Sequence, residues 1–180
     1  VKGFQAEGRL GFEEVCYLLL FGELPNREDL AAFTALVGEL RALPENFTED
    51  MILKIPSHNI MNKLARSVLV SYSYDPLSDD LDVRNVLLQC LKLIARFPTM
   101  VAYGYQALAR NYEGKSLYLH HPDADMGAAE NFLRMIRPDA HFSRLEAETL
   151  DLAFVLHAEH GGGNNSAFTV HVVSSTATDT

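Results

Sequence analysis

Apolar residues recur at helical spacing along nearly the whole chain. The first clear case is the run Phe12, Val15, Cys16, Leu19 and Leu20, which follows the pattern i, i+3, i+4, i+7, i+8. This spacing places the apolar side chains on one face of an α-helix, because the helix has about 3.6 residues per turn. Comparable patterns continue almost to the end of the chain. The sequence therefore predicts an all-α fold with little or no sheet.

Capping residues and prolines divide this pattern into separate helices. Asn26 and Ser57 are suitable N-caps, and Ser143 with Glu146 forms the capping-box pattern. Pro98 lies inside the longest helical stretch and predicts a kink or a break there, because proline lacks the backbone N–H and crowds the preceding turn. We expect helices over approximately residues 12–21, 26–40, 48–54, 57–75, 82–110, 126–136 and 143–157, with a loop or short extended piece over 115–123.

The tail that begins at Ser166 has a different composition. It is rich in valine and threonine, and on intrinsic propensity it predicts a strand.

Size and charge limit the classes of function. The 180 residues correspond to about one domain, and 48% hydrophobic with 22% charged residues is ordinary globular usage. The formal net charge of −9 argues against nucleic acid or an anionic membrane as the main partner. No uninterrupted apolar run approaches the roughly 18 residues of a membrane span; the densest is Val15–Phe21.

Two further features concern the cellular setting. Cys16 and Cys90 both lie in apolar helical stretches and are too few for a disulfide framework, which predicts a reducing compartment and a cytoplasmic location. The chain begins with Val1 without a leader-like segment, and its patterned tail continues to Thr180. From these ends we expect a piece of a longer protein.

The segment from His157 to Ser166 contains the most chemically active side chains. A metal site would use His157 and His160, which are three residues apart, but the segment lacks the embedded glutamate of the HExxH zinc motif. The spacing selects no third ligand among the candidates Glu159, His120, His121, His141 and His171. We therefore expect no metal.

Two glycine-rich motifs also fit this segment poorly. An esterase-type oxyanion loop is rejected because no GxSxG nucleophile motif occurs in the 180 residues. A phosphate-binding P-loop requires Gly-Lys-Ser/Thr in register after the glycines, whereas Asn-Asn-Ser follows here.

Capture of a small carboxylate is the remaining chemical interpretation. Glycines allow backbone amides to approach a ligand closely, Asn165 or Ser166 could cap a following helix, and His160 could donate a hydrogen bond to the anion. The spacing leaves open a structural alternative, in which the glycines only turn the chain and His160 makes one hydrogen bond within the protein.

Four ordered stretches resemble the citrate synthase family, which includes 2-methylcitrate synthase. FEEVCYLLLFGELP (residues 12–25) resembles FEEVAYLLLFGELP, LKLIARFPTMVAY (91–103) resembles LIAKLPTIVAY, and ENFL (130–133) recurs unchanged. FVLHAEHG (154–161) with NSAFTVHVVSSTATD (165–179) is similar to LILHADHG-N-ST-FT-RVV-ST-SD. Glu159 stands where the family commonly has aspartate, and the likeness spans essentially the whole chain.

This resemblance implies an almost wholly helical homodimer with a large and a small domain. Such enzymes condense acetyl-CoA with oxaloacetate to citrate and CoA, with acetyl-CoA as a substrate and without a cofactor. By resemblance His160 binds the oxaloacetate carboxylate, while Asn164, Asn165 and Ser166 support the catalytic histidine and His157 is structural. The tail after Ser166 should then be a helix, against its propensity.

The resemblance also implies what this chain lacks. The catalytic histidines of the family lie in GPLHGGAN-type and GFGH-type motifs, and neither motif occurs in these 180 residues. The aspartate base and the carboxylate-binding arginines come later still. We expect residues 1–180 to be an N-terminal part of the large domain that supplies one wall of the oxaloacetate site and part of a dimer surface, without a catalytic residue and inactive alone. The alternatives are a 2-methylcitrate synthase that uses propionyl-CoA, or a non-catalytic, self-associating helical module.

Overall fold

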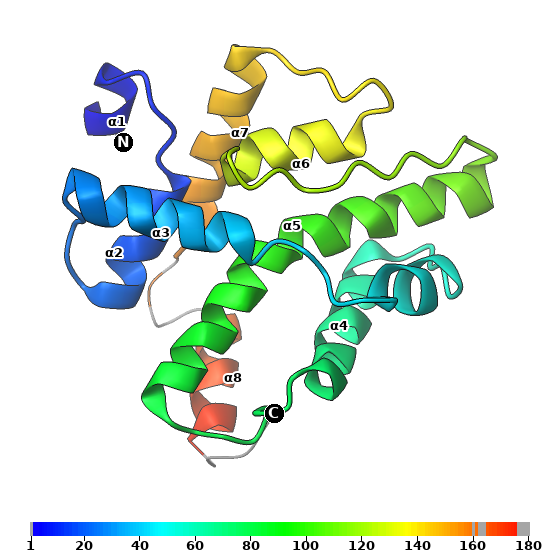
Figure 1. The fold of residues 1–180 in the computed structure, drawn as a ribbon, viewed down its shortest axis with the longest axis horizontal. Helices are drawn as coiled ribbons and strands as arrows, with labels where there is room; N and C mark the ends of the chain where they lie inside the picture. The colour runs from blue at the N-terminus through cyan, green and yellow to red at the C-terminus, as the bar shows by residue number, and fades with distance from the viewer. Residues whose placement is uncertain (1, 160, 162–164, 176–180) are drawn as a thin grey trace.

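The computed structural model describes residues 2–159, 161 and 165–175, and every regular element in these residues is helical (Figure 1). The predicted all-α fold is therefore confirmed. The elements are α1 (Lys2–Ala6), α2 (Phe12–Phe21), α3 (Arg27–Glu39), η1 (Thr48–Leu53), α4 (Ile60–Ser71), η2 (Tyr72–Tyr74), α5 (Val83–Glu113), α6 (Ala128–Ile136), α7 (Arg144–His157) and α8 (Asn165–Ser174).

The caps of α3 and α7 are the ones that the sequence predicts. The Asn26 side chain accepts hydrogen bonds from the backbone N–H groups of Glu28 and Asp29, both at 2.9 Å. Ser143 and Glu146 form the complete capping box, because each side chain accepts from the backbone N–H of the other residue. Both helices thus begin where a local side chain replaces the missing intrahelical partner.

The cap predicted for α4 is wrong by two residues. Asn59 caps this helix, with its side chain accepting from the backbone N–H of Asn62 at 2.9 Å. The hydroxyl of Ser57 instead accepts from the N–H of Asn59, which closes a short turn before the helix. Serine makes such local turns as readily as caps, so the helix begins later than the sequence alone indicates.

Helix α5 is the central element of the fold. It passes through Pro98 without a break, and Figure 1 shows it changing direction near its middle, where Pro98 lies in the sequence. The predicted kink is confirmed, and the helix continues because neighbouring elements hold both halves. It packs against α3, α4, η1 and α6. Two clusters of buried apolar side chains lie along it: Cys16, Phe33, Val37, Leu91 and Ala95 in one, and Phe47, Ile52, Met100, Ala102, Tyr103, Ala107 and Met135 in the other.

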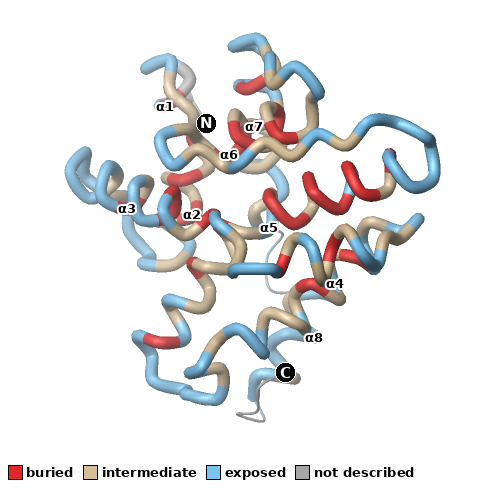
Figure 2. The backbone as a smooth tube through the Cα atoms, turned by 45° about the vertical axis from the view of Figure 1, so that its right-hand side comes forward, coloured by how far each residue is buried: buried red, intermediate tan, exposed pale blue. Residues whose placement is uncertain are grey.

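By length and composition alone, α5 could also cross a membrane, and 33% of its most apolar window is buried inside the protein. Figure 2 shows buried positions concentrated along the second half of this helix, which faces its neighbours. That location is typical of a core helix.

The tail forms a helix, so the prediction of a strand from propensity is wrong and the expectation from the family resemblance is confirmed. None of the described residues of α8 is buried, and its apolar side chains Phe168, Val170 and Val172 are exposed. A strand needs a neighbouring strand for its backbone hydrogen bonds, and the described part of the chain offers none. A helix satisfies its backbone within the segment.

Candidate functional site

The predicted carboxylate site lies at the connection between α7 and α8. Helix α7 ends at His157, whose side chain is exposed and whose Nδ1 is 2.7 Å from the carbonyl oxygen of Ala153 in the same helix. After α7 the carboxylate of Glu159 accepts a hydrogen bond from the backbone N–H of Gly161 at 2.5 Å. Gly161 has φ +80°, in the left-handed region that favours glycine.

Two of the predicted site residues, His160 and Asn164, lie outside the described residues. The other two, Asn165 and Ser166, form the first turn of α8 and are exposed. The prediction that Asn165 or Ser166 caps the helix stays a prediction, because residues 162–164 lie outside the described residues. The carbonyl oxygen of Asn165 accepts a hydrogen bond from the hydroxyl of Thr169 at 2.7 Å.

The metal interpretation stays untested, because it uses His160, which lies outside the described residues. Within the described residues, no group of three histidine, cysteine, aspartate or glutamate side chains is placed to hold an ion. One of the proposed third ligands, His120, is engaged elsewhere: its Nε2 lies 3.0 Å from the carbonyl oxygen of Arg137 and 3.2 Å from that of Pro138.

A buried carboxylate anchors α7 before it reaches this connection. Asp151, only 2% exposed, accepts hydrogen bonds from the backbone N–H groups of Gly11 at 2.7 Å and Phe12 at 3.1 Å. These are the first amides of α2, so a side chain of α7 caps a helix that begins 139 residues earlier. Burial raises the pKa of the Asp151 carboxyl, while the two amides lower it. Asp151 lies on the same face of α7 as Ala147 and Phe154, and a carboxylate on an apolar face is the signal that sequence reasoning missed.

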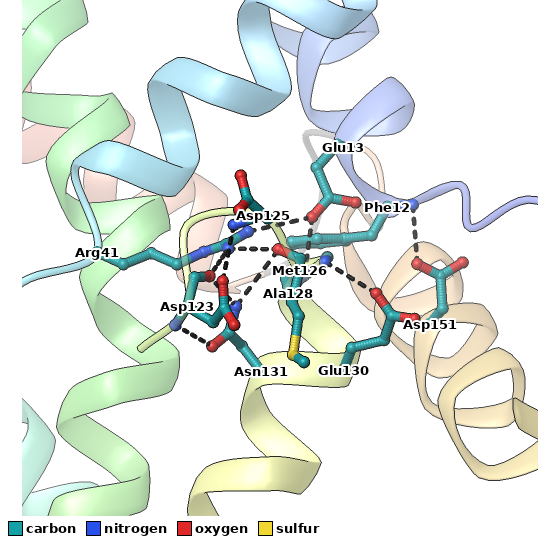
Figure 3. Close-up of polar contacts among 11 residues, drawn as sticks. Phe12, Glu13, Arg41, Asp123, Asp125, Met126, Ala128, Glu130, Asn131 and Asp151 are labelled. Atoms are coloured by element: carbon teal, nitrogen blue, oxygen red, sulfur yellow. Dashed lines mark hydrogen bonds and ion pairs between the residues drawn. The ribbon is translucent and has the colours of Figure 1, made fainter. Parts of the chain in front are cut away.

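A second buried carboxylate caps α6 in the same manner. Glu13 of α2 accepts a hydrogen bond from the backbone N–H of Ala128 at 2.7 Å and forms an ion pair with Arg41, Nη2 to Oε1, at 3.6 Å (Figure 3). Burial raises the pKa of Glu13 against the opposing effects of the Ala128 amide and the Arg41 charge. Arg41 follows α3, so this contact joins three helices.

The loop before α6 is held by the same polar cluster, as Figure 3 shows. The guanidinium of Arg41 donates to the carbonyl oxygens of Asp123 and Met126. Asn131 of α6 donates to the same two carbonyls and accepts from the backbone N–H of Asp123 at 2.7 Å. Glu130 accepts from the N–H of Gly127 at 3.0 Å. These bonds pair the backbone carbonyls of Asp123 and Met126 and the N–H groups of Asp123 and Gly127 in a partly buried loop.

Aromatic side chains complete the contact between α7 and its neighbours. The ring of Phe154 lies 5.3 Å from that of Phe12 and 6.4 Å from that of Phe132. Beside these rings is an apolar hollow of about 350 Å³, lined by Phe12, Ile94, Phe97, Pro98, Val101, Phe132 and Phe154.

A comparison with protein families identifies the family of this chain. The sequence model of the family described as "Citrate synthase, C-terminal domain" matches residues 5–180. The chain belongs to the citrate synthase family. Citrate synthase 1 of Mycobacterium tuberculosis is 33% identical over 175 residues, which cover 91% of this chain and 38% of that protein. The 2-methylcitrate synthase of Shewanella oneidensis is 30% identical over 175 residues, covering 93% and 42%.

Solved structures agree with this assignment. The crystal structure of citrate synthase from Pyrobaculum aerophilum superimposes with a TM-score of 0.75 at 30% identity, covering 92% of this chain and 41% of that chain. The chain therefore spans about two fifths of the length of the relatives that it matches.

The stretches that resemble citrate synthase now have structural roles. The stretch 12–25 contains Glu13, which caps α6, and the stretch 130–133 contains Glu130 and Asn131, which hold the loop before α6. The stretch 91–103 lies within α5 and contains Pro98. The family pattern in this chain thus coincides with contacts that join helices distant in sequence.

Proposed function

We propose that this chain forms part of a citrate-synthase-type acyltransferase and supplies one wall of its oxaloacetate site. The observation that carries the proposal is the match of residues 5–180 to the family, which includes the whole connection between α7 and α8. In the proposed site His160 donates to a carboxylate of oxaloacetate, and Asn164, Asn165 and Ser166 support the neighbouring catalytic group. Gly161, with its positive φ, gives the chain the turn that such a site needs.

The reaction of the complete enzyme requires a base that removes a proton from the acetyl methyl group and donors that stabilise the enolate and polarise the ketone. The new carbon–carbon bond joins the methyl carbon to the ketone carbon, and hydrolysis of the thioester releases CoA. We place these groups in the part of the enzyme that has no counterpart in the 180 residues. This chain therefore binds and orients the keto acid and moves no proton.

Binding of oxaloacetate to the chain tests the site directly. Titration followed by NMR should show shifts at the amides from Glu159 to Ser166, with weak affinity, because one wall of the site is present. His160→Ala should abolish these shifts. His141→Ala is the matched control, because His141 is an exposed histidine in a loop before α7. Equal binding by wild type and His160→Ala would remove His160 from the site.

An activity assay tests whether the catalytic groups lie outside the 180 residues. The 180-residue protein should release no CoA from acetyl-CoA and oxaloacetate, or from propionyl-CoA and oxaloacetate. Turnover at the rate of a full-length citrate synthase would contradict the absence of a catalytic group. The relatives include both citrate synthase and 2-methylcitrate synthase at similar identity, so both acyl-CoA substrates belong in the assay.

A second candidate function, a self-associating helical module, is favoured by one observation. The apolar side chains Phe168, Val170 and Val172 of α8 are 63%, 67% and 48% exposed. Exposed apolar surface of this kind promotes association. Sedimentation with and without oxaloacetate separates the two functions: association that is indifferent to the ligand, together with an unperturbed NMR spectrum, would favour the module. We include homodimer formation in the proposed enzyme.

A further inference from the structure

A polar pocket of about 200 Å³ lies between the first half of α5 and the segment that precedes it in sequence. Its walls come from the end of α4, from η2, from the connection that follows η2, and from α5. The charged side chains of the lining are Asp75, Lys92 and Arg96. The pocket thus contains two positive charges and one negative charge, in a chain whose formal net charge is −9.

The two cations come from adjacent turns of one helix. Lys92 and Arg96 are four residues apart on α5, so their side chains lie on the same face. Like charges at this spacing repel each other and destabilise a helix. From Val83 to Tyr112 the helix contains no acidic residue that could offset the repulsion from within α5. An anion bound between the two side chains would remove this cost.

Asp75 neutralises only part of this charge. One carboxylate oxygen, Oδ2, pairs with Lys92 Nζ at 3.2 Å, and the other, Oδ1, accepts from the backbone N–H of Leu77 at 3.1 Å. Gln89 of α5 donates to the carbonyl oxygen of Leu77 at 3.1 Å and so ties the connection to the helix. Asp75 is therefore committed to Lys92 and to its own turn.

Arg96 has no such carboxylate partner. Its Nε donates to the carbonyl oxygen of Ala42 at 3.1 Å, and none of the ion pairs within the described residues includes Arg96. Burial lowers the pKa of Arg96, and the charge of Asp75 opposes this effect only in part. A guanidinium has five N–H donors, and the contact with Ala42 uses one of them.

We propose that this pocket binds the phosphate group of a small molecule between Lys92 and Arg96. Arg96 supplies a planar fork of donors and Lys92 a compact charge, and both are suited to phosphate oxygens. Two cations fit a phosphate better than a single carboxylate, because a phosphate carries close to two negative charges at neutral pH. The site uses none of the residues of the proposed oxaloacetate site, so the inference does not rest on the proposed function.

The first test is titration of the 180-residue protein with inorganic phosphate, followed by NMR at low ionic strength and neutral pH. Phosphate should shift the amides of residues 71–78 and 89–96, and acetate at the same concentration should shift them less. Arg96→Gln, which keeps a donor for the Ala42 carbonyl, should weaken phosphate binding about tenfold. Arg84→Gln is the matched control, because Arg84 is an exposed arginine of the same helix and its removal changes the net charge equally.

Three results of this titration would overturn the proposal. They are a wild-type protein that does not bind phosphate, an Arg96→Gln variant that binds it like wild type, and equal weakening by Arg96→Gln and Arg84→Gln. Phenyl phosphate identifies the source of the phosphate group. Tighter binding of phenyl phosphate than of inorganic phosphate would support an organic phosphate as the ligand, and equal binding would support free phosphate.

The second test predicts a gain of binding, which a loss of folding cannot imitate. Asp75→Asn keeps an acceptor for the N–H of Leu77 but removes the negative charge beside Lys92. This variant should bind inorganic phosphate about threefold more tightly than wild type, because one repulsive charge at the site is gone. Asp79→Asn is the control, since Asp79 is an exposed aspartate of the same connection that does not line the pocket. Unchanged or weaker phosphate binding by folded Asp75→Asn would overturn the proposal.

Discussion

The Glu13 carboxylate accepts a hydrogen bond from the backbone N–H of Ala128 at 2.7 Å, although the two residues are 115 positions apart in sequence. This bond caps α6 from α2, and the same carboxylate faces the guanidinium of Arg41. Glu13 thus caps a helix and pairs with a buried charge, so its removal should lower the free energy of unfolding.

We expect Glu13→Ala to lower the free energy of unfolding by about 3 kcal/mol, because it leaves the Ala128 amide unsatisfied and the charge of Arg41 unpaired in the interior. Glu13→Gln keeps an acceptor oxygen and should cost about 1 kcal/mol. Urea unfolding measures both. Glu39→Ala, an exposed glutamate of α3, serves as the control and should change stability by less than about 0.5 kcal/mol.

The Asn131 position should require a side-chain amide, because both the donor and the acceptor of that amide are used. Its side chain, 2% exposed, donates to the carbonyls of Asp123 and Met126 and accepts from the N–H of Asp123. Asn131→Asp preserves the shape but turns both donors into acceptors that face carbonyl oxygens, so we expect a loss of about 3 kcal/mol at neutral pH. Asn62→Asp is the matched control, because Asn62 is exposed on α4. Thermal unfolding that is equally affected in both variants would contradict this role.

The capping box of α7 should make the free energy of unfolding depend on pH in the acid range. Hydrogen bonds from Arg137 and Ser143 lower the pKa of Glu146 from 4.5 to about 2. Because the folded-state pKa lies below the unfolded value, this contribution to stability is present above pH 4.5 and is lost as the pH falls toward about 2. Urea unfolding of Glu146→Gln should show a smaller loss of stability between these pH values than wild type does. Glu39→Gln, which removes one exposed charge, should keep the wild-type dependence.

Two glycines inside helices should respond oppositely to alanine. A Cβ at Gly38 of α3 would overlap the carbonyl oxygen of Ala124, in the loop that Arg41 and Asn131 bind. Gly38→Ala should therefore destabilise the protein by about 3 kcal/mol.

Gly104 of α5 is the internal control for that substitution. Its Cβ would meet Lys63 Cγ at 3.6 Å, an ordinary contact, so Gly104→Ala should be tolerated or stabilising by about 0.5–1 kcal/mol through the better helix propensity of alanine. Similar melting temperatures for the two variants would show that the close approach at Gly38 is relieved by movement of the loop.

Local sequence chemistry determined most of the helices. The spacing of apolar residues over 12–20, the cap at Asn26 and the capping box at Ser143 and Glu146 each act within a few residues, so they can be read without knowing the fold. The cap of α4 shows the limit of this approach, because Ser57 and Asn59 are both suitable and only the backbone path decides between turn and cap. The glycines and histidines of residues 157–166 also predict a carboxylate site, which stays a prediction.

Only the tertiary structure shows which side chains bind the backbone of distant helices and loops. Nothing in the local pattern indicates that Asp151 caps α2, that Glu13 caps α6, or that Arg41 supports the loop before α6, because each partner is a backbone group 82 to 140 residues away. The helical tail was likewise not decided by its own propensity, since a strand requires a partner that the described chain does not offer. Short-range hydrogen bonds depend only on residues that are close in sequence. The hydrogen-bond partners of buried polar groups depend instead on which distant segments the fold brings together.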